Sequence, residues 1–288
     1  MKFLIWGGKG WIGSMICDLL RFKGYTVILA TARLDNYPAI LSEIKSENPD
    51  FVINSAGITG VPNVDWCENN KQATIFTNVI GTINLAMACS IESVHMTNFA
   101  SGCIYTYDKI GKELIYRKFL ETDEPTFYKS TYSFSKAMAQ KLLDFYPNVL
   151  TLRLRMPITY DLNPKSFLTK ITKYAKVINI PNSMTILPQL LPIALEMTLQ
   201  KITGIYNFTN PGAISHNEVL TLYRDYVDST FTWTNFTVEE QDTILKAPRS
   251  NCELDTTKIQ EFCRTNNIEL PEVKNAMILV MREIKKDK

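Results

Sequence analysis

Short apolar runs rich in β-branched residues alternate with longer amphipathic segments through the first half of the chain. Such alternation predicts parallel strands joined by crossover helices. The strands are expected at Lys2–Trp6, Tyr25–Ala30, Phe51–Asn54, Val94–Ala100 and Val149–Arg153. The helices are expected at Trp11–Phe22, Ala39–Glu47, Gln72–Ser90 and Tyr132–Phe145. This order indicates an α/β fold with a doubly wound parallel sheet of the Rossmann type over residues 1–155.

The pattern changes from Met156 onward, where prolines become frequent and the apolar runs become shorter. We expect residues 156–288 to form a smaller α+β region that binds substrate, with some segments returning to the first domain. Ser215 and Glu218 stand three apart before an apolar run, which predicts a capping box at the start of a helix. His216 would then lie at the surface of the first helical turn.

Composition narrows the class of protein. The 288 residues carry a formal net charge of +2, which implies no nucleic-acid partner. No stretch approaches the roughly 20 apolar residues of a membrane helix, so we expect no membrane partner. Six cysteines without a Cys-x-x-Cys pair favour a reducing, cytoplasmic compartment over a disulfide framework or a metal site. With two histidines, a Ser-His-Asp hydrolase is not favoured.

A glycine-rich turn follows the first expected strand and opens the first helix. Gly7, Gly10 and Gly13 have the G-x-x-G-x-x-G spacing typical of short-chain dehydrogenases. Glycines permit close approach of the backbone, and the helix N-terminus offers free N–H groups to a pyrophosphate. The residues expected to bind a dinucleotide cofactor here are Gly7, Lys9, Gly10, Trp11, Ile12 and Gly13.

The end of the second strand bears on the choice of cofactor. An acidic residue there holds the ribose 2′-OH of NADH, whereas an arginine accommodates the 2′-phosphate of NADPH. Thr31 and Arg33 follow directly after this strand, and the nearest acidic residue in the sequence is Asp35. We therefore expect NADPH, with Thr31 and Arg33 contacting its phosphate. An ordinary surface charge is the alternative interpretation of Arg33.

The turn after the third strand resembles the Asn-Ala-Ala-Gly turn of short-chain dehydrogenases. It contributes Asn54, Ala56 and Gly57, which we expect beside the adenosine half of the cofactor. Asn78, in the following helix, is expected to hold this turn in place.

Tyr132 and Lys136 form a Tyr-x-x-x-Lys pair at the start of an expected helix. Residues four apart share one helix face, and an ammonium beside a phenol lowers the phenol pKa from about 10. Ser101, at the end of the fourth strand, is placed to hydrogen-bond a substrate carbonyl. These three residues predict reduction of a ketone, with Tyr132 and Lys136 also contacting the cofactor.

Nearly the whole chain resembles extended short-chain dehydrogenases that act on nucleotide-4-keto-6-deoxysugars, most of all the bifunctional nucleotide-rhamnose synthases, which are 3,5-epimerases and 4-reductases. The segments that carry the resemblance are Gly60–Glu68, Gly102–Ile104, Arg155–Ile158, Val177–Leu187, Asn207–Asn217, Asn235–Gln241 and Ala247–Asn251. The resemblance implies conversion of a nucleotide 4-keto-6-deoxyglucose, UDP-linked in preference to dTDP-linked, to nucleotide L-rhamnose. It further implies an upstream 4,6-dehydratase that supplies the substrate. Relatives commonly form dimers, so a homodimer is one expectation, and the oligomeric state stays open from the sequence.

The resemblance also assigns residues that spacing alone would not. Cys103 and Lys170 match the acid/base pair of the epimerisation, whereas reductases without epimerase activity have another residue, commonly tyrosine, at the cysteine position. Asn182 and Arg249 are expected to bind substrate. Without the resemblance, Cys103 is a small buried side chain and Lys170 a solvated helix charge.

Two other functions stay open from the sequence. One is a reductase alone, acting on dTDP-4-keto-rhamnose that another enzyme has epimerised. The other is a non-catalytic Rossmann protein that senses NADPH, against which the Tyr132 and Lys136 pair argues.

Overall fold

The computed structural model describes every residue except 62, 112, 238–239, 241–242, 244 and 287–288. Parts of the segments Gly60–Glu68 and Asn235–Gln241 therefore lie outside the described residues. The chain forms two compact units. The first comprises Met1–Ile104, Pro125–Arg153 and Ala194–Tyr206, and the second comprises Tyr105–Glu124, Leu154–Ile193 and Asn207–Lys288. The chain thus passes between units several times, including an early excursion at Tyr105–Glu124.

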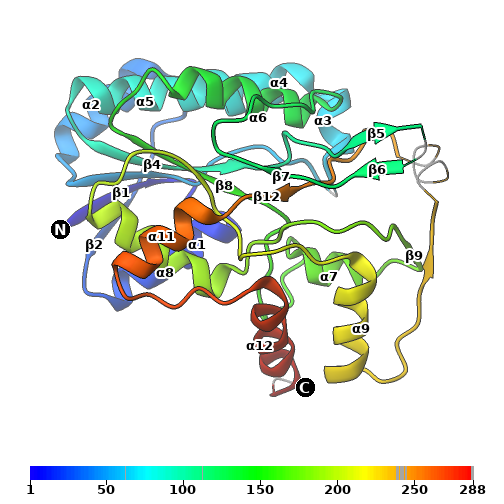
Figure 1. Cartoon of the computed structure of the whole chain (residues 1–288). Coiled ribbons are helices and arrows are strands. Elements are labelled where there is room, and N and C mark those ends of the chain that lie inside the picture. The colour runs from blue at the N-terminus through cyan, green and yellow to red at the C-terminus, as the bar shows by residue number, and fades with distance from the viewer. Residues whose placement is uncertain (62, 112, 238–239, 241–242, 244, 287–288) are drawn as a thin grey trace. The chain divides into compact units, whose positions relative to one another are not determined.

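A six-stranded sheet in the order β10-β8-β4-β3-β1-β2 forms the centre of the first unit (Figure 1). Its strands are β1 (Lys2–Trp6), β2 (Thr26–Leu29), β3 (Phe51–Asn54), β4 (His95–Ser101), β8 (Val149–Leu154) and β10 (Gly204–Asn207). β1 pairs in parallel with both β2 and β3, and β3 pairs in parallel with β4. This confirms the predicted Rossmann-type sheet. β10 was not expected from the sequence.

The strand order reverses between β1 and β3. From β1 the chain first continues to β2 on one side, and it then crosses to β3 and β4 on the other side. Such a switch point opens a crevice at the carboxyl ends of the strands, where sheets of this class bind ligands. The turns after β1, β3 and β4 all lie at those ends, because the three strands are parallel. The fold therefore brings together three segments that are far apart in the sequence.

Helices cover the sheet of the first unit on both faces (Figure 1). The helices are α1 (Trp11–Phe22), α2 (Tyr37–Glu47), α3 (Asp65–Asn69), α4 (Lys71–Ile75), α5 (Thr82–Ile91) and α6 (Thr131–Leu143). One core cluster joins Ile40 and Ile44 of α2 and Leu85 of α5 to Leu4 and Val52 of the sheet, all nearly inaccessible. Each such side chain contributes about 1.5–3 kcal/mol when fully buried.

Local signals explain where these helices begin. The Asn36 side chain accepts the N–H of Ala39 at 3.2 Å, and Pro38 lies in the first turn of α2. The Ser130 hydroxyl accepts the N–H of Ser133 at 3.1 Å and so caps α6. The start of α6 is therefore fixed one residue before Tyr132.

The expected long helix at Gln72–Ser90 is a helical run from α4 to α5 with a π-helical segment, η1 (Phe76–Gly81), between them. This run, Lys71–Ile91, is long and apolar enough by length and composition to cross a membrane, contrary to our expectation from the sequence. Half of its most apolar window is buried inside the protein, and it packs on α2 and α6. Both features are those of a crossover helix in a globular core.

The second unit contains α7 (Phe167–Ile171), α9 (His216–Tyr226), α11 (Thr257–Thr265) and α12 (Val273–Lys286). Its short strands are β5 (Asp108–Ile110), β6 (Glu113–Ile115), β7 (Lys118–Phe119), β9 (Lys176–Val177), β11 (Thr234–Asn235) and β12 (Glu253–Leu254). Helix α8 (Leu187–Leu199) runs from this unit into the first. The core of the second unit lies where α7, α9 and α12 meet, and it includes Leu168, Val219, Leu220, Met277 and Met281.

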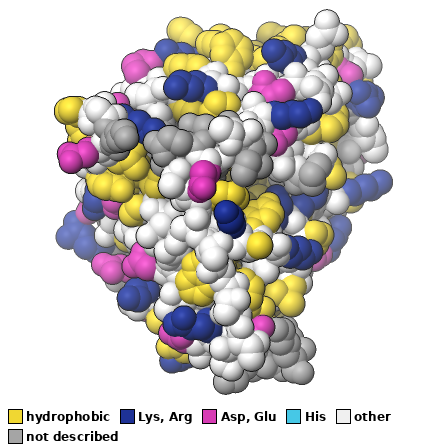
Figure 2. All heavy atoms as spheres, turned by 90° about the vertical axis from the view of Figure 1, so that its right-hand side faces the viewer, with side chains coloured by type: hydrophobic (Ala, Val, Ile, Leu, Met, Phe, Trp, Pro, Cys, Tyr) yellow, Lys and Arg dark blue, Asp and Glu magenta, His cyan; other side chains and the backbone are white. Residues whose placement is uncertain are grey.

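Charges of both signs lie on the face of the molecule that Figure 2 draws. On the face that Figure 2 draws, Lys and Arg side chains are interspersed with acidic and hydrophobic ones. This distribution agrees with the formal net charge of +2.

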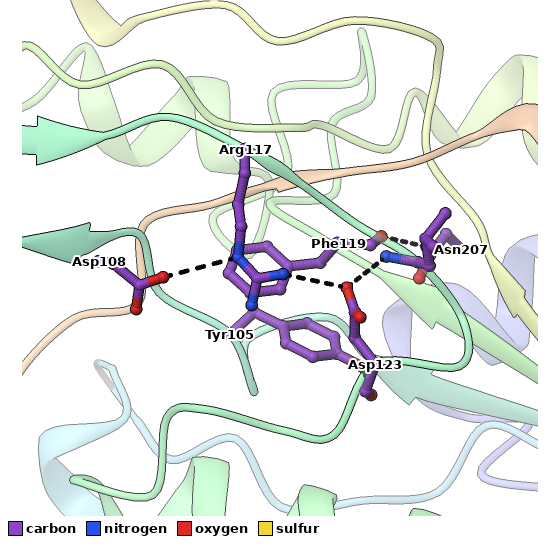
Figure 3. Close-up of polar contacts among 7 residues, drawn as sticks. Tyr105, Asp108, Arg117, Phe119, Asp123 and Asn207 are labelled. Atoms are coloured by element: carbon purple, nitrogen blue, oxygen red, sulfur yellow. Dashed lines mark hydrogen bonds and ion pairs between the residues drawn. The ribbon is translucent and has the colours of Figure 1, made fainter.

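Arg117 anchors the early excursion of the second unit (Figure 3). Its guanidinium lies 4.1 Å from the centroid of the Phe119 ring and forms ion pairs with Asp108 at 3.6 Å and Asp123 at 3.5 Å. Phe119 in turn stacks on Tyr105, whose hydroxyl donates to the carbonyl of Asp123 at 2.8 Å. These contacts tie the β5–β6 hairpin to β7.

Candidate active site

The turn after β1 is built for close contact with a ligand backbone. Gly7 has a φ of +76°, and a Cβ there would lie 2.5 Å from the Ala56 nitrogen. A Cβ on Gly13 would lie 2.1 Å from the Gly7 carbonyl oxygen. The turn closes with the Gly10 N–H donating to the Gly7 carbonyl at 2.8 Å. Only glycines fit here, so the first N–H groups of α1 stay open to an anion.

Trp11 supports the assignment of this turn to a cofactor. Its indole Nε1 is buried and has no hydrogen-bond partner among the residues that the structure describes. A buried donor without a partner costs about 1–3 kcal/mol, which a bound ligand can recover. The glycine cradle and this donor fit a dinucleotide pyrophosphate, with the exposed Lys9 and half-buried Ile12 in the same turn.

The turn after β3 is held rigidly, as expected. The Asn78 side chain accepts the N–H of Ile58 at 2.8 Å and donates to the Ile58 carbonyl at 2.9 Å and to the Ser135 hydroxyl at 3.1 Å. Asn78 lies in the π-helical turn η1, which widens the helix where it reaches the loop. Asn54 accepts the N–H of Ala56 at 3.1 Å. The turn is thereby tied to helix α6.

Two acidic side chains occupy the end of β2. Glu43 accepts hydrogen bonds from the N–H and the hydroxyl of Thr31, and Asp35 forms an ion pair with Arg33 at 2.8 Å. The sequence pointed to Asp35 alone, because Glu43 lies twelve residues beyond Thr31 within α2. The roles of Thr31 and Arg33 toward a cofactor phosphate stay predictions.

Ser101, Tyr132 and Lys136 come together at the carboxyl end of β4. Ser101 is buried and forms a hydrogen bond with the half-buried Tyr132. The Lys136 ammonium lies 6.0 Å from the centroid of the Tyr132 ring. A Cβ on Gly57 would lie 3.1 Å from Lys136 Nζ, so the turn after β3 also borders this lysine. The structure thus groups the three residues that the sequence predicted to act together.

The pKa of Tyr132 shifts in the direction opposite to the one expected from its spacing to Lys136. Burial raises the pKa of Tyr132, electrostatic repulsion between the ionised forms of Tyr132 and Cys103 raises it further, and the hydrogen bond with Ser101 opposes the rise. The expected lowering of the Tyr132 pKa toward neutrality was therefore wrong for the protein by itself. Burial lowers the pKa of Lys136 to about 8. Tyr132 is held as a neutral phenol, which is the form that can donate a proton.

Cys103 lies in the same group. Its backbone N–H donates to the Ser101 hydroxyl at 3.1 Å, and its side chain is half-buried. Its side chain is close enough to Tyr132 for their ionised forms to repel each other. Cys103 therefore shares a site with Ser101 and Tyr132, as the resemblance implied.

Lys170 belongs to the second unit, near the end of the short helix α7. Burial lowers its pKa, and repulsion from Lys165 lowers it further. The side chain is half-buried, so the alternative of a fully solvated helix charge does not hold. A lowered pKa increases the share of neutral amine, which can accept a proton.

The two expected substrate-binding residues differ in exposure. Asn182 is fully buried, accepts the N–H of Cys252 at 3.0 Å and donates to Asn251 Oδ1 at 3.0 Å. It also accepts a hydrogen bond from the buried Arg155. Asn182 thus holds the loop at 250–252, and Arg249 beside that loop is half-buried. Direct contact of either residue with substrate stays a prediction.

The expectation that His216 lies at the surface was wrong. Ser215 and Glu218 form the predicted capping box, but His216 is only 9% exposed and packs edge-on against Phe167 at 5.2 Å. Burial lowers its pKa to about 4. The first turn of α9 faces α7, which a local capping pattern does not reveal.

The residues that the structure describes contain no cluster of metal-ligating side chains. Among them, no group of three His, Cys, Asp or Glu side chains could hold an ion. All six cysteines are free thiols in this structure.

The fold and this site define a short-chain dehydrogenase/reductase, with a dinucleotide turn and a Ser-Tyr-Lys group on one Rossmann-type sheet. The sequence profile of the NAD dependent epimerase/dehydratase family matches residues 3–155. The chain belongs to this family.

Relatives agree with that assignment. A bifunctional dTDP-4-dehydrorhamnose 3,5-epimerase/dTDP-4-dehydrorhamnose reductase of Arabidopsis thaliana is 50% identical over 281 residues, 96% of this chain and 91% of the relative. The same plant has a trifunctional UDP-glucose 4,6-dehydratase/UDP-4-keto-6-deoxy-D-glucose 3,5-epimerase/UDP-4-keto-L-rhamnose-reductase that is 50% identical to this chain over 262 residues. The aligned part covers 91% of this chain and 39% of that protein. The crystal structure of a UDP-rhamnose synthase from Acanthamoeba polyphaga mimivirus superposes with a TM-score of 0.92 at 39% identity, covering 98% of this chain and 99% of the other. The predicted resemblance and the prediction of an enzyme are confirmed.

Proposed function

We propose that this chain is a bifunctional enzyme that converts a UDP-linked 4-keto-6-deoxyglucose to UDP-L-rhamnose by 3,5-epimerisation followed by reduction at C4. The observation that carries the proposal is the 50% identity to a bifunctional epimerase/reductase along 96% of the chain. Relatives that act on dTDP-linked and on UDP-linked sugars both match. The preference for UDP rests on the mimivirus structure, which aligns along 98% of this chain.

Epimerisation needs a proton removed from one face of the sugar and returned on the other. The C4 ketone acidifies the protons on C3 and C5, so removal of either leaves an enolate with its charge on the C4 oxygen. Ser101 and Tyr132 donate hydrogen bonds to that oxygen, each worth roughly 3 kcal/mol. Cys103 and Lys170 exchange the protons, and the lowered pKa of Lys170 suits it to that task.

Reduction uses the same donors. A bound reduced nicotinamide cofactor supplies a hydride for C4, and we propose NADPH as that cofactor because Arg33 follows β2. Tyr132, neutral because burial raises its pKa, gives its proton to the C4 oxygen. Lys136 beside it stabilises the phenolate that remains and orients the cofactor ribose. The same two donors, Ser101 and Tyr132, can therefore serve both reactions.

An upstream 4,6-dehydratase must supply the 4-keto substrate, and the trifunctional relative carries such an activity in its own chain. We also propose a cytoplasmic homodimer. The free cysteines support a reducing compartment, and light scattering after size-exclusion chromatography tests the dimer.

Incubation with UDP- or dTDP-4-keto-6-deoxyglucose and NADPH, without a separate epimerase, tests the proposal. We expect NADPH oxidation at 340 nm and an L-rhamno product by NMR, faster with the UDP sugar. Formation of rhamnose only after an epimerase is added would leave a reductase alone. No NADPH oxidation with either sugar would favour the non-catalytic sensor.

A further inference from the structure

A carboxylate of the chain itself is bound to Thr31, one of the two residues expected from the sequence to contact the 2′-phosphate of NADPH. Glu43 Oε1 accepts the N–H of Thr31 at 2.7 Å and the Thr31 hydroxyl at 2.8 Å. Glu43 Oε2 accepts the N–H of Ala32 at 2.8 Å. Two backbone amides and one hydroxyl therefore converge on one anionic group. The end of β2 is an anion site, and in this structure its anion is Glu43.

The site is preformed by the sheet. The Ala32 carbonyl accepts the indole N–H of the buried Trp6 at 2.9 Å, which fixes the backbone where β2 ends. Glu43 is half-buried on α2, a helix whose start is fixed by Asn36 and Pro38. Because both sides are anchored, this contact differs from an ion pair between two flexible surface side chains.

Arg33 also holds a carboxylate of the chain, but this pair lies at the surface, where the Arg33 side chain is 81% exposed. Its Nε and one terminal nitrogen donate to the Asp35 carboxylate at distances from 2.8 to 3.2 Å. The donors expected to bind a 2′-phosphate, at Thr31 and Arg33, thus each hold a carboxylate of the same chain.

We propose that Glu43 is a specificity-determining residue that weakens the selection of NADPH over NADH. This inference rests on the proposed use of a nicotinamide cofactor. A 2′-phosphate can reach the amides of Thr31 and Ala32 only when Glu43 leaves them, and it then meets a neighbouring negative charge. The 2′-OH of NADH can instead donate to the carboxylate that is already in place. Glu43 therefore sets a dual specificity that Arg33 alone would not allow.

Binding of 2′,5′-ADP and of 5′-ADP, measured by calorimetry, isolates the 2′-phosphate without catalysis or substrate. Glu43→Gln keeps the shape of the side chain and removes its charge, and Glu43→Ala removes the carboxylate entirely. We expect each variant to bind 2′,5′-ADP about tenfold more tightly, while 5′-ADP binds as before or more weakly. Arg33→Ala should shift the ratio of the two affinities in the opposite direction.

Glu47→Gln is the matched control, because it removes an equal charge one turn further along α2 and leaves the three bonds of Glu43 in place. It should leave both affinities within about twofold of the wild type. An unchanged affinity ratio in both Glu43 variants, or equal weakening of both nucleotides, would overturn the inference. If the wild type binds neither nucleotide, the cofactor assignment itself is wrong, which is a separate result.

Discussion

The Glu68 carboxylate accepts two hydrogen bonds from Thr131, the first residue of helix α6, which carries the Tyr-x-x-x-Lys pair. Its Oε1 accepts the N–H of Thr131 at 2.7 Å, and its Oε2 accepts the Thr131 hydroxyl at 2.8 Å. The two residues are 63 positions apart, and Tyr132 follows directly. A carboxylate at a helix N-terminus satisfies open N–H groups and interacts favourably with the helix dipole. Glu68 is thus a positioning residue for Tyr132.

Replacing Glu68 by Ala should lower kcat for ketone reduction about three- to tenfold, because both bonds to Thr131 are lost and Tyr132 shifts. KM should change little, because a positioning role acts on the proton donor Tyr132 and not on the binding of substrate. Steady-state kinetics checks this split. Thr131→Ser keeps both donors and should behave as the wild type, whereas Thr131→Val should change kcat in the same direction as the Glu68 variant. A rise in KM with unchanged kcat would contradict the positioning role.

Tyr132→Phe should lower the rate of reduction at least about a hundredfold, the usual contribution of a positioned proton donor. Only a hydroxyl is lost, so the melting temperature and the affinity for NADPH should stay near those of the wild type. Stopped-flow measurement of NADPH oxidation gives the rate. Near-wild-type turnover would remove Tyr132 from the mechanism.

Cys103 and Lys170 can be tested by deuterium incorporation. In deuterated water, the wild-type product should carry deuterium at both C3 and C5, because each centre is deprotonated and reprotonated. Cys103→Ala and Lys170→Ala should each suppress incorporation at one or both carbons, as NMR of the product would show.

Reduction of a 4-keto sugar that is already epimerised provides the control for these variants. It should persist in Cys103→Ala, because Ser101, Tyr132 and Lys136 remain. Full deuterium incorporation in both variants would exclude them as the acid/base pair.

The burial of His216 predicts a pH dependence of stability. Its pKa falls from 6.5 to about 4 on folding, so the unfolded chain binds more protons between these values. The free energy of unfolding should therefore fall as the pH drops from 6.5 toward 4, by up to about 1.4 kcal/mol per pH unit for each such group. His95, whose pKa burial also lowers to about 4, adds a similar share.

Urea denaturation between pH 4.5 and 7 measures that slope. His216→Gln should make it about half as steep, whatever its effect on stability at neutral pH, because one of the two buried histidines no longer titrates. An unchanged slope would mean that His216 is protonated in the folded protein at its ordinary pKa.

The sequence by itself determined the features that depend on neighbours along the chain. The first strand and helix, at Lys2–Trp6 and Trp11–Phe22, have the bounds predicted from the hydrophobic pattern and the glycine turn. The sequence could identify residues whose geometry is local. Gly7 and Gly13 belong to one turn, and Tyr132 and Lys136 share one helix face. The parallel arrangement then places Ser101 with them, since strands of a βαβ unit end at one edge.

The tertiary structure alone decided what depends on contact between distant segments and on burial. Glu43 at Thr31, Glu68 at Thr131 and the buried His216 carry no local signal, because the partner lies on another element or the solvent is excluded by another helix. The same holds for charge: the pKa of Tyr132 follows from burial and from Cys103, which the spacing to Lys136 could not show. Spacing fixes which side chains share a face, whereas desolvation and long-range pairing are properties of the packed chain.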